Sequence, residues 1–271
     1  MPLEWPGLLV IGSLAGVLSG MFGIGGGVII VPALILFLGF TEIEAISTSL
    51  GALLLPVGIF AVIAYYRSGL LRIRESIWMA LGLIITTALG AWGALEMEAI
   101  DPDLLKRVYG VFLFWIGWRF VQPRKLYREW AARRGVQVKT AQPGTAPGEL
   151  EPQRPWYVVF GVGLVAGVAS GMFGIGGGAV IVPALTAVLR YDQKLAVGTS
   201  LGALLLPVGL PGVLVYVEQD VLDIVAAAVV AVGLMFGAIL GARIALNLPS
   251  ATVKRMYGLF LFFVALRFIF G

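Results

Sequence analysis

The sequence predicts an all-α polytopic membrane protein made of two inverted repeats. Each repeat is expected to contain a glycine-tipped re-entrant helix hairpin and three transmembrane helices. Three observations predict this fold: long uncharged apolar segments, an internal duplication, and a reversal of loop charge between the two copies. Of the 271 residues, 59% are hydrophobic and 13% are charged, and the mean hydropathy is +0.98. A chain this apolar cannot hide its surface in one soluble core, and a helix satisfies its own backbone polar groups in lipid.

Formal charge is absent from several long stretches of the chain, some of which reach the roughly 20 apolar residues that cross a bilayer. The first stretch lacks a basic beginning and continues into a glycine run, so we interpret it as mature protein and not as a cleaved signal peptide. The uncharged stretches are 5–41, 45–66, 76–95, 108–118, 155–189, 195–217 and 224–242.

The chain repeats itself with a shift of 151 residues. GMFGIGGG occurs at 20–27 and 171–178, and TSLGALLLPVG occurs at 48–58 and 199–209. Such self-similarity indicates a duplicated structural unit. We therefore divide the chain into a first membrane repeat (1–121), a basic, proline-rich cytoplasmic linker (122–157) and a second, inverted membrane repeat (158–271).

Each repeat begins with a glycine-containing segment, 6–39 or 157–189, that is too long for one crossing. As a straight helix, 34 residues would span about 50 Å, against a hydrocarbon core of about 30 Å. The segment is therefore either two short helices that meet at the glycines or a tilted helix with a long tail. In the first copy, three ordinary apolar segments follow, at about 42–66, 76–95 and 104–120.

The charges of equivalent loops have opposite signs in the two copies. Positive loops mark the cytoplasmic side, so the repeats are predicted to be inverted, with the linker inside and both termini outside. A conventional model with eight crossings remains the alternative. The basic loops carry Arg67, Arg72 and Arg74 in the first copy and Arg243, Lys254 and Arg255 in the second; the acidic loops carry Glu96, Glu98, Asp101 and Asp103, and Glu218, Asp220 and Asp223.

The glycine runs suggest an anion site without a buried cation. Glycine accepts positive φ and lets a ligand approach the backbone, and each run precedes a short helix whose N-terminus carries a partial positive charge. A phosphate-binding loop is discounted because no Gly-Lys-Ser/Thr follows. Packing alone is the competing interpretation, and we favour it for the ladders Gly12, Gly16, Gly20 and Gly163, Gly167, Gly171. The glycines predicted to face substrate are Gly23, Gly25, Gly26 and Gly27, and Gly174, Gly176, Gly177 and Gly178.

Six hydroxyl side chains interrupt the apolar segments near the glycines and near Pro56 and Pro207. They either bond the carbonyl of the preceding helical turn or donate to the substrate. We include them in the candidate binding site: Ser19, Thr48, Ser49, Ser170, Thr199 and Ser200.

The absence of cysteine and histidine removes the commonest nucleophile, general base and metal ligands. We therefore expect no enzyme activity, no metal and no cofactor. The surplus of positive charge lies in loops, where it sets membrane orientation, so we expect no nucleic-acid partner. No Asp, Glu or His lies within the uncharged segments, so a proton relay has no evident seat. A uniporter driven by the anion gradient is the simplest expectation, and proton coupling is its rival.

The duplicated SGMFGIGGG and VPAL elements, followed by TSLGALLLPVG, resemble the sulfite exporter TauE/SafE family, also called the toluene sulfonate uptake permease family. The resemblance covers nearly the whole chain. It implies a bacterial or archaeal inner-membrane transporter of small sulfur-containing anions such as sulfite, sulfonate, sulfoacetate or thiosulfate. We favour export by alternating access around a midplane site between the glycine hairpins; a passive anion channel and an importer of organosulfur anions are the alternatives, and homodimerisation is left open. The copies differ at Ser47 and Gly198, so the two halves of the site are not identical.

Overall fold

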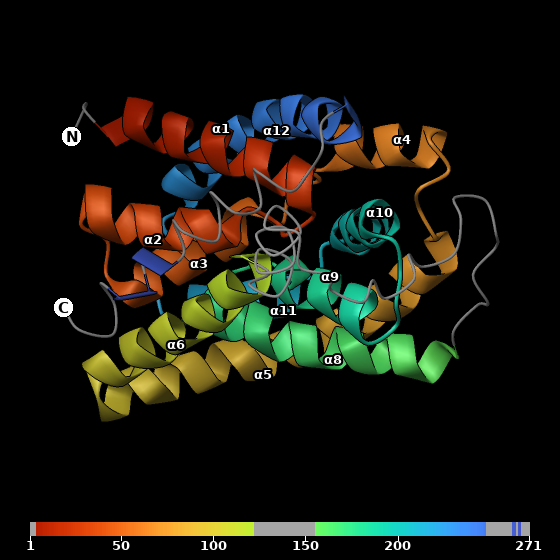
Figure 1. Cartoon of the computed structure of the whole chain (residues 1–271). Helices are drawn as coiled ribbons and strands as arrows, with labels where there is room; N and C mark the ends of the chain where they lie inside the picture. The colour runs from red at the N-terminus through yellow and green to blue at the C-terminus, as the bar shows by residue number, and fades with distance from the viewer. Residues whose placement is uncertain (1–3, 122–154, 248–261, 264, 267–271) are drawn as a thin grey trace, which may run out of the picture. The chain divides into compact units, whose positions relative to one another are not determined.

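The computed structural model describes residues 4–121, 155–247, 262–263 and 265–266, and every regular element within those ranges is a helix (Figure 1). The predicted linker falls outside the described residues up to 154. The helices are α1 (Glu4–Phe22), α2 (Gly27–Leu38), α3 (Glu42–Ala52), α4 (Ile59–Arg67), α5 (Ile73–Ile100), α6 (Pro102–Val121), α8 (Trp156–Phe173), α9 (Gly178–Ala187), α10 (Gln193–Leu204), α11 (Leu210–Glu218) and α12 (Ile224–Asn247).

The chain forms two compact units. The first contains Met1–Leu105 and Arg154–Leu248, and the second contains Lys106–Gln153 and Pro249–Gly271. Within the second unit, the ring of Phe114 on α6 meets the ring of Phe262 edge to face, with centroids 4.9 Å apart. The features that form the candidate site all belong to the first unit.

Four helices of the first unit are long and apolar enough to cross a membrane: α1, α5, α8 and α12. Large apolar side chains on their outer faces are more than half exposed, among them Leu14, Ile85, Val165 and Phe236. Exposure of this kind is costly in water and is the normal state of a lipid-facing side chain. The fold is that of a multi-pass helical membrane protein.

The predicted transmembrane segment at 42–66 is not one helix. It divides into α3 and α4, and its counterpart at 195–217 divides into α10 and α11. The break has the same cause in both copies, because Pro56 and Pro207 have no N–H to donate and disfavour helical geometry in the residue before them. Matching turns bridge the break, with Val57 N–H donating to Leu55 O and Val208 N–H to Leu206 O, both at 2.6 Å.

The long helices pack as two close pairs, α1 with α12 and α5 with α8, each joining one half of the sequence to the other. Figure 1 shows α1 beside α12, and α5 beside α8. A Cβ added at Gly12, Gly16 or Gly20 would overlap the backbone of α12, and one at Gly163, Gly167 or Gly171 would overlap atoms of α5. The glycine ladders therefore let the helix backbones touch, which confirms their packing interpretation.

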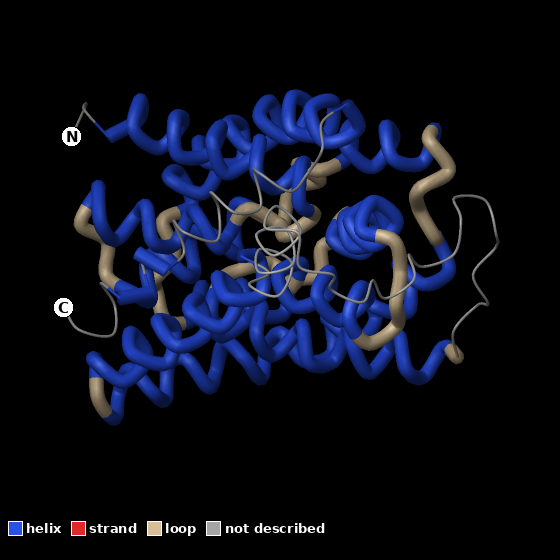
Figure 2. Tube along the Cα trace, viewed as in Figure 1, coloured by secondary structure: helices blue, strands red, loops and turns tan. Residues whose placement is uncertain are grey.

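The chain turns back on itself at each glycine run. A Cβ on Gly7, near the start of α1, would lie 3.4 Å from the Leu38 side chain at the end of α2, and one on Gly26 would lie 3.6 Å from Ala15 O. In the second half, a Cβ on Gly177 would lie 3.4 Å from Ala166 O. Residues 23–26 and 174–177 form the two loops at these turns, called here the glycine loops. Figure 2 draws loop segments in the interior, between the helices.

Candidate functional site

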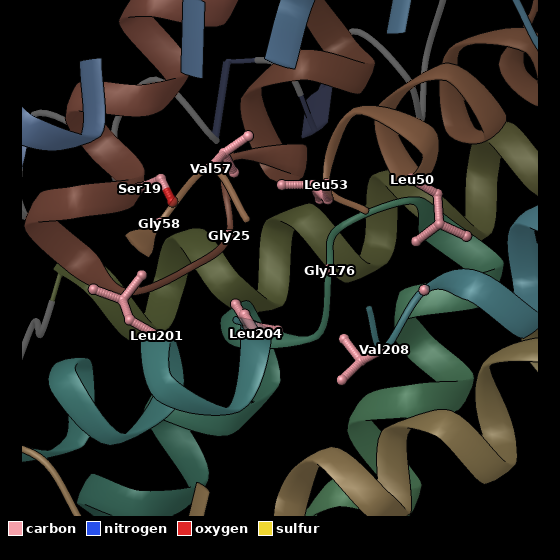
Figure 3. Close-up of a pocket in the computed structure, with 11 residues that line it drawn as sticks. Ser19, Gly25, Leu50, Leu53, Val57, Gly58, Gly176, Leu201, Leu204 and Val208 are labelled. Atoms are coloured by element: carbon pink, nitrogen blue, oxygen red, sulfur yellow. The ribbon is translucent and has the colours of Figure 1, made fainter. Parts of the chain in front are cut away.

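A small cavity lies where the two glycine loops meet. The volume of this cavity is about 30 Å³, which is enough for about two water molecules. Ten of the eleven lining residues form five pairs related by the 151-residue shift, and Ser19 is the lining residue without its counterpart (Figure 3). The lining residues are Ser19, Gly25, Leu50, Leu53, Val57, Gly58, Gly176, Leu201, Leu204, Val208 and Gly209.

No lining residue is charged, and Ser19 is the one lining residue with a polar side chain. Gly25 and Gly176 bring the two loops against each other here, because a Cβ on Gly25 would lie 3.0 Å from Ile175 O and 3.7 Å from the Gly176 Cα. The walls are otherwise leucine and valine side chains. Any polar contact with a small ligand in this cavity must therefore come from backbone groups and the Ser19 hydroxyl.

Both glycine loops have the same backbone conformation. Gly23, Gly25 and Gly26 have φ of 67°, 83° and 80°, and Gly174, Gly176 and Gly177 have φ of 65°, 70° and 81°. These angles lie in the left-handed region, which costs a residue with a Cβ roughly 1–2 kcal/mol. Three such angles among four residues explain why the sequence repeats glycine here.

Gly27 and Gly178 are glycines for a different reason. A Cβ on Gly27 would overlap Gly174 O, and a Cβ on Gly178 would overlap Gly23 O. Each loop thus places a carbonyl against the Cα atom that begins the other half's short helix. These two predicted ligand-facing glycines bring the halves into contact and do not line the cavity.

The helices that follow the loops, α2 and α9, begin at Gly27 and Gly178 beside this contact. Their first amide groups have no carbonyl one turn earlier within the helix, and the end of each helix carries roughly half a positive charge. Gly26 and Gly177 are the N-cap residues, and neither cap has a side-chain hydrogen bond. The arrangement places two partially positive helix ends at one uncharged site.

Ser49 and Ser200 connect each half to the loop of the other. The Ser49 hydroxyl donates to Gly174 O at 2.7 Å, and the Ser200 hydroxyl donates to Gly23 O at 2.9 Å. Both serines are fully buried. A hydroxyl has one proton to donate, so these two predicted ligands use it here to hold the facing glycine loop.

The other four predicted hydroxyls have different environments. Ser19 lines the cavity. Thr199 Oγ1 accepts a hydrogen bond from the Arg72 N–H at 3.2 Å. Thr48, its counterpart, and Ser170, the counterpart of Ser19, are fully buried, and their hydroxyls have no hydrogen-bond partner among the described residues.

The sequence analysis missed the apolar part of the site. Leu50, Leu53 and Val57 line the cavity together with their counterparts in the second half. The repeated TSLGALLLPVG motif contains all six of these side chains, but only its hydroxyl residues were included in the predicted site. Also missed were Tyr65 and Tyr216, whose hydroxyls donate to Gly20 O and Gly171 O at 3.4 and 2.8 Å, just before the loops.

Within the described residues, no group of three or more His, Cys, Asp or Glu side chains is placed to hold a metal ion. Nothing in the cavity lining supplies a nucleophile beyond the Ser19 hydroxyl, and no imidazole exists in the chain to activate it. The chemistry that the lining supports is reversible binding by hydrogen bonds and apolar contact.

A family model described as Sulfite exporter TauE/SafE matches residues 8–268. The chain is 29% identical over 203 residues to a probable membrane transporter protein of Methanocaldococcus jannaschii, covering 73% of this chain and 67% of that one. It is 25% identical over 273 residues to the probable membrane transporter protein YunE of Bacillus subtilis, covering 97% and 96%. It is 30% identical over 268 residues to a probable membrane transporter protein of Xylella fastidiosa, covering 95% and 92%. No solved structure matches the chain.

Proposed function

Because the chain belongs to the sulfite exporter TauE/SafE family, and is thus a membrane transporter, we propose that it exports small sulfur-containing oxyanions by alternating access. The substrate class includes sulfite, sulfonates, sulfoacetate and thiosulfate. The anion binds between the two glycine loops, and the binding groups are backbone N–H groups and hydroxyls. No cofactor and no catalytic residue takes part.

The observation that carries the proposal is that two helix N-termini lie at the contact between the glycine loops, next to an uncharged cavity that Gly25 and Gly176 line. Helix ends that point at a midplane site are a recurring way to hold an anionic group in a transporter. A buried Lys or Arg would hold the anion more tightly, and would also slow its release. Ser19, Thr48 and Ser170 add hydroxyls that are not committed to carbonyls of the facing loop.

We further propose that the repeats are inverted in the inner membrane and that α1–α2 and α8–α9 are re-entrant hairpins. Two observations support this. Ser47 on α3 donates to Val221 O at 2.7 Å, in the acidic segment before α12. Lys194 at the start of α10 donates to Leu246 O at 3.3 Å, near the other end of α12. The homologous helices α3 and α10 thus begin near opposite ends of one long helix.

Cysteine labelling in this cysteine-free chain tests the topology. We expect Ser68→Cys, in a basic loop, to react only from the cytoplasmic side, and Asp220→Cys, in an acidic loop, to react only from outside. Both positions are exposed. Labelling of position 220 from the cytoplasmic side would favour the model with eight crossings, which places the acidic loop of the second copy inside. External labelling at position 68 would contradict the assignment of the basic loop to the cytoplasmic side.

A flux panel in proteoliposomes tests the substrate and the mechanism. We expect saturable transport of at least one of sulfite, thiosulfate and sulfoacetate in preference to sulfate, phosphate and chloride. Rates far above those of carriers, without saturation, would indicate a passive anion channel. Imposed gradients of either direction in oriented vesicles distinguish export from import. A panel without any anion flux would contradict the proposal. The same purified sample, sized in detergent, shows whether the protein is a homodimer.

A further inference from the structure

The structure buries one acidic side chain that the transport proposal does not use. This side chain is Glu75, which lies in the first turn of α5. It is 5% exposed, and it is the one charged residue among those described that is classed as buried. Neither of its carboxylate oxygens has a hydrogen-bond partner among the described residues. An ionisable group buried in a membrane transporter is expensive to keep and commonly serves an ion or proton step.

The charged neighbour of Glu75 is Arg72, whose Nη1 lies 3.7 Å from the carboxylate Oε1. Arg72 also lies over the ring of Tyr191, 5.6 Å from its centroid. Other charged residues near this end are Arg74 on α5 itself, and Arg190 and Asp192, which flank Tyr191 in the segment that leads into α10. α8 has no charged residue, Glu218 lies at the far end of α11, and the acidic residues of α3 lie in its first turn, where the chain leaves α2. Lys194 of α10 bonds Leu246 O.

This ion pair is connected to the cavity through three successive residues of α10. The Thr199 hydroxyl accepts a hydrogen bond from the backbone N–H of Arg72. The Thr199 carbonyl accepts a second one, at 2.8 Å, from the hydroxyl of Ser76, which follows Glu75 in the chain. Ser200 holds Gly23 O. Leu201 lines the cavity.

The connection has no equivalent in the other half. At the positions related by the 151-residue shift, Arg72, Glu75 and Ser76 are replaced by Asp223, Ala226 and Ala227. One end of a nearly symmetric site therefore carries a buried carboxylate beside a half-buried arginine, and the other end does not.

We propose that Glu75 is a proton-binding site that couples a proton to the transported anion, an inference that rests on the proposed transport function. When the Glu75 carboxylate takes one proton from water, the pair changes from net zero charge to the single positive charge of Arg72. That charge lies beside α10 and attracts an anion at the loops. By linkage, the bound anion favours the protonated carboxylate to the same extent. Proton and anion then bind together and leave together, so both cross the membrane in the same direction. Because an inward proton gradient opposes export by this route, net export requires that the outward anion gradient, together with the membrane potential acting on any excess negative charge, exceeds it.

The test measures anion affinity against pH in the purified protein. Methanesulfonate and thiosulfate serve as probes because neither changes its charge between about pH 4.5 and 8. In the wild type we expect affinity to rise as the pH falls, by up to about tenfold per pH unit where one proton is taken up per anion. Glu75→Gln, which cannot take up that proton, should bind with an affinity that does not vary with pH. Glu75→Asp should restore the variation, and Glu218→Gln, at an exposed carboxylate, should keep the wild-type profile.

Flux measurements complete the test. A pH gradient alone should drive uptake of the probe against its concentration gradient in the wild type and in Glu75→Asp, but not in Glu75→Gln. If Glu75→Gln keeps the wild-type pH profile and the pH-driven uptake, Glu75 is not the proton site. If the wild type binds and transports none of the anions, the transport proposal itself has failed. Should Glu75→Gln not fold, a wild-type affinity independent of pH would still overturn the inference.

Discussion

The two halves of the molecule agree where they meet at the glycine loops and differ at their outer ends. At the centre, the bonds come in matched pairs: Ser49 with Ser200, on Gly174 O and Gly23 O, and Tyr65 with Tyr216, on Gly20 O and Gly171 O. One outer end contains the contacts of Arg72, Glu75 and Ser76. In the other half, these three residues are replaced by Asp223, Ala226 and Ala227.

The comparison indicates that the two regions obey different constraints. The central pairs join one half to the other, so a change on one side must be matched on the other for the loops to face each other. The outer contacts of Arg72 and Ser76 with Thr199 also join the halves, but they lie at one end alone and can diverge without a matching change at the other end. A substitution at a central position should therefore have the same effect in both halves, and one at an outer position should not.

The largest effect is expected at the glycines where one loop touches the other. Gly27→Ala and Gly178→Ala each drive a methyl group into a backbone carbonyl of the facing loop. Since a backbone cannot move aside like a flexible side chain, we expect each to lower the free energy of unfolding by about 3 kcal/mol or more. Thermal unfolding in detergent measures it. Gly161→Ala, where an added Cβ meets nothing within 4 Å, is the control. Unequal losses at the two sites would break the central symmetry.

The next effect is on transport. Gly25→Val and Gly176→Val add bulk to the cavity lining at residues with positive φ, so we expect each variant to insert into the membrane and to lose anion flux. Flux in proteoliposomes and the elution profile in detergent report the two properties separately. If both variants keep wild-type flux, these glycines are packing elements and the cavity is not the substrate site.

The sequence predicted the class, the duplication and the segments of this fold, because hydropathy and repeated motifs depend on composition and order alone. It did not predict that the segment at 42–66 breaks into α3 and α4. Pro56 allows either a kinked helix or a break, and neighbouring packing decides between them.

The candidate site was predicted by residue type more than by role. Gly25, Gly176 and Ser19 line the cavity as residues of a binding site would. Ser49 and Ser200 looked the same in the sequence, yet they bond carbonyls that lie 125 and 177 residues away. A hydroxyl's partner depends on which segments meet in space, and spacing along one segment does not carry that information. The burial of Glu75 was hidden for the same reason, since α10, which packs on α5, comes from the other half.

An intermediate effect is expected from the two serines that hold the loops. Ser49→Ala and Ser200→Ala each leave a buried carbonyl oxygen without its donor, which costs about 1–3 kcal/mol. We expect the two losses to agree within about 0.5 kcal/mol, as measured by thermal unfolding, and anion affinity to fall in both because the loops lose their fixed geometry. Arg243→Gln is the control, and we expect its effect on anion affinity to be far smaller than that of either alanine variant. A collapse of affinity in Arg243→Gln with both alanine variants unchanged would mean that an arginine holds the anion.

The smallest effect on stability is expected at Thr48 and Thr199, and here the two halves should respond differently to the same substitution. Thr199→Val removes the acceptor of the Arg72 N–H, so we expect a loss of about 1 kcal/mol in the free energy of unfolding. Thr48→Val replaces a buried hydroxyl that has no partner among the described residues by a methyl group of similar size, so stability should stay constant or rise slightly.

If the Thr48 hydroxyl instead donates a hydrogen bond to the anion, the same variant should lose roughly tenfold or more in affinity, because a hydrogen bond to a charged group contributes about 1.5–3 kcal/mol. Titration of thiosulfate into both variants, beside their unfolding curves, separates the two roles. Equal losses of stability at Thr48 and Thr199 would show that the asymmetry of this end does not extend to its hydrogen bonds.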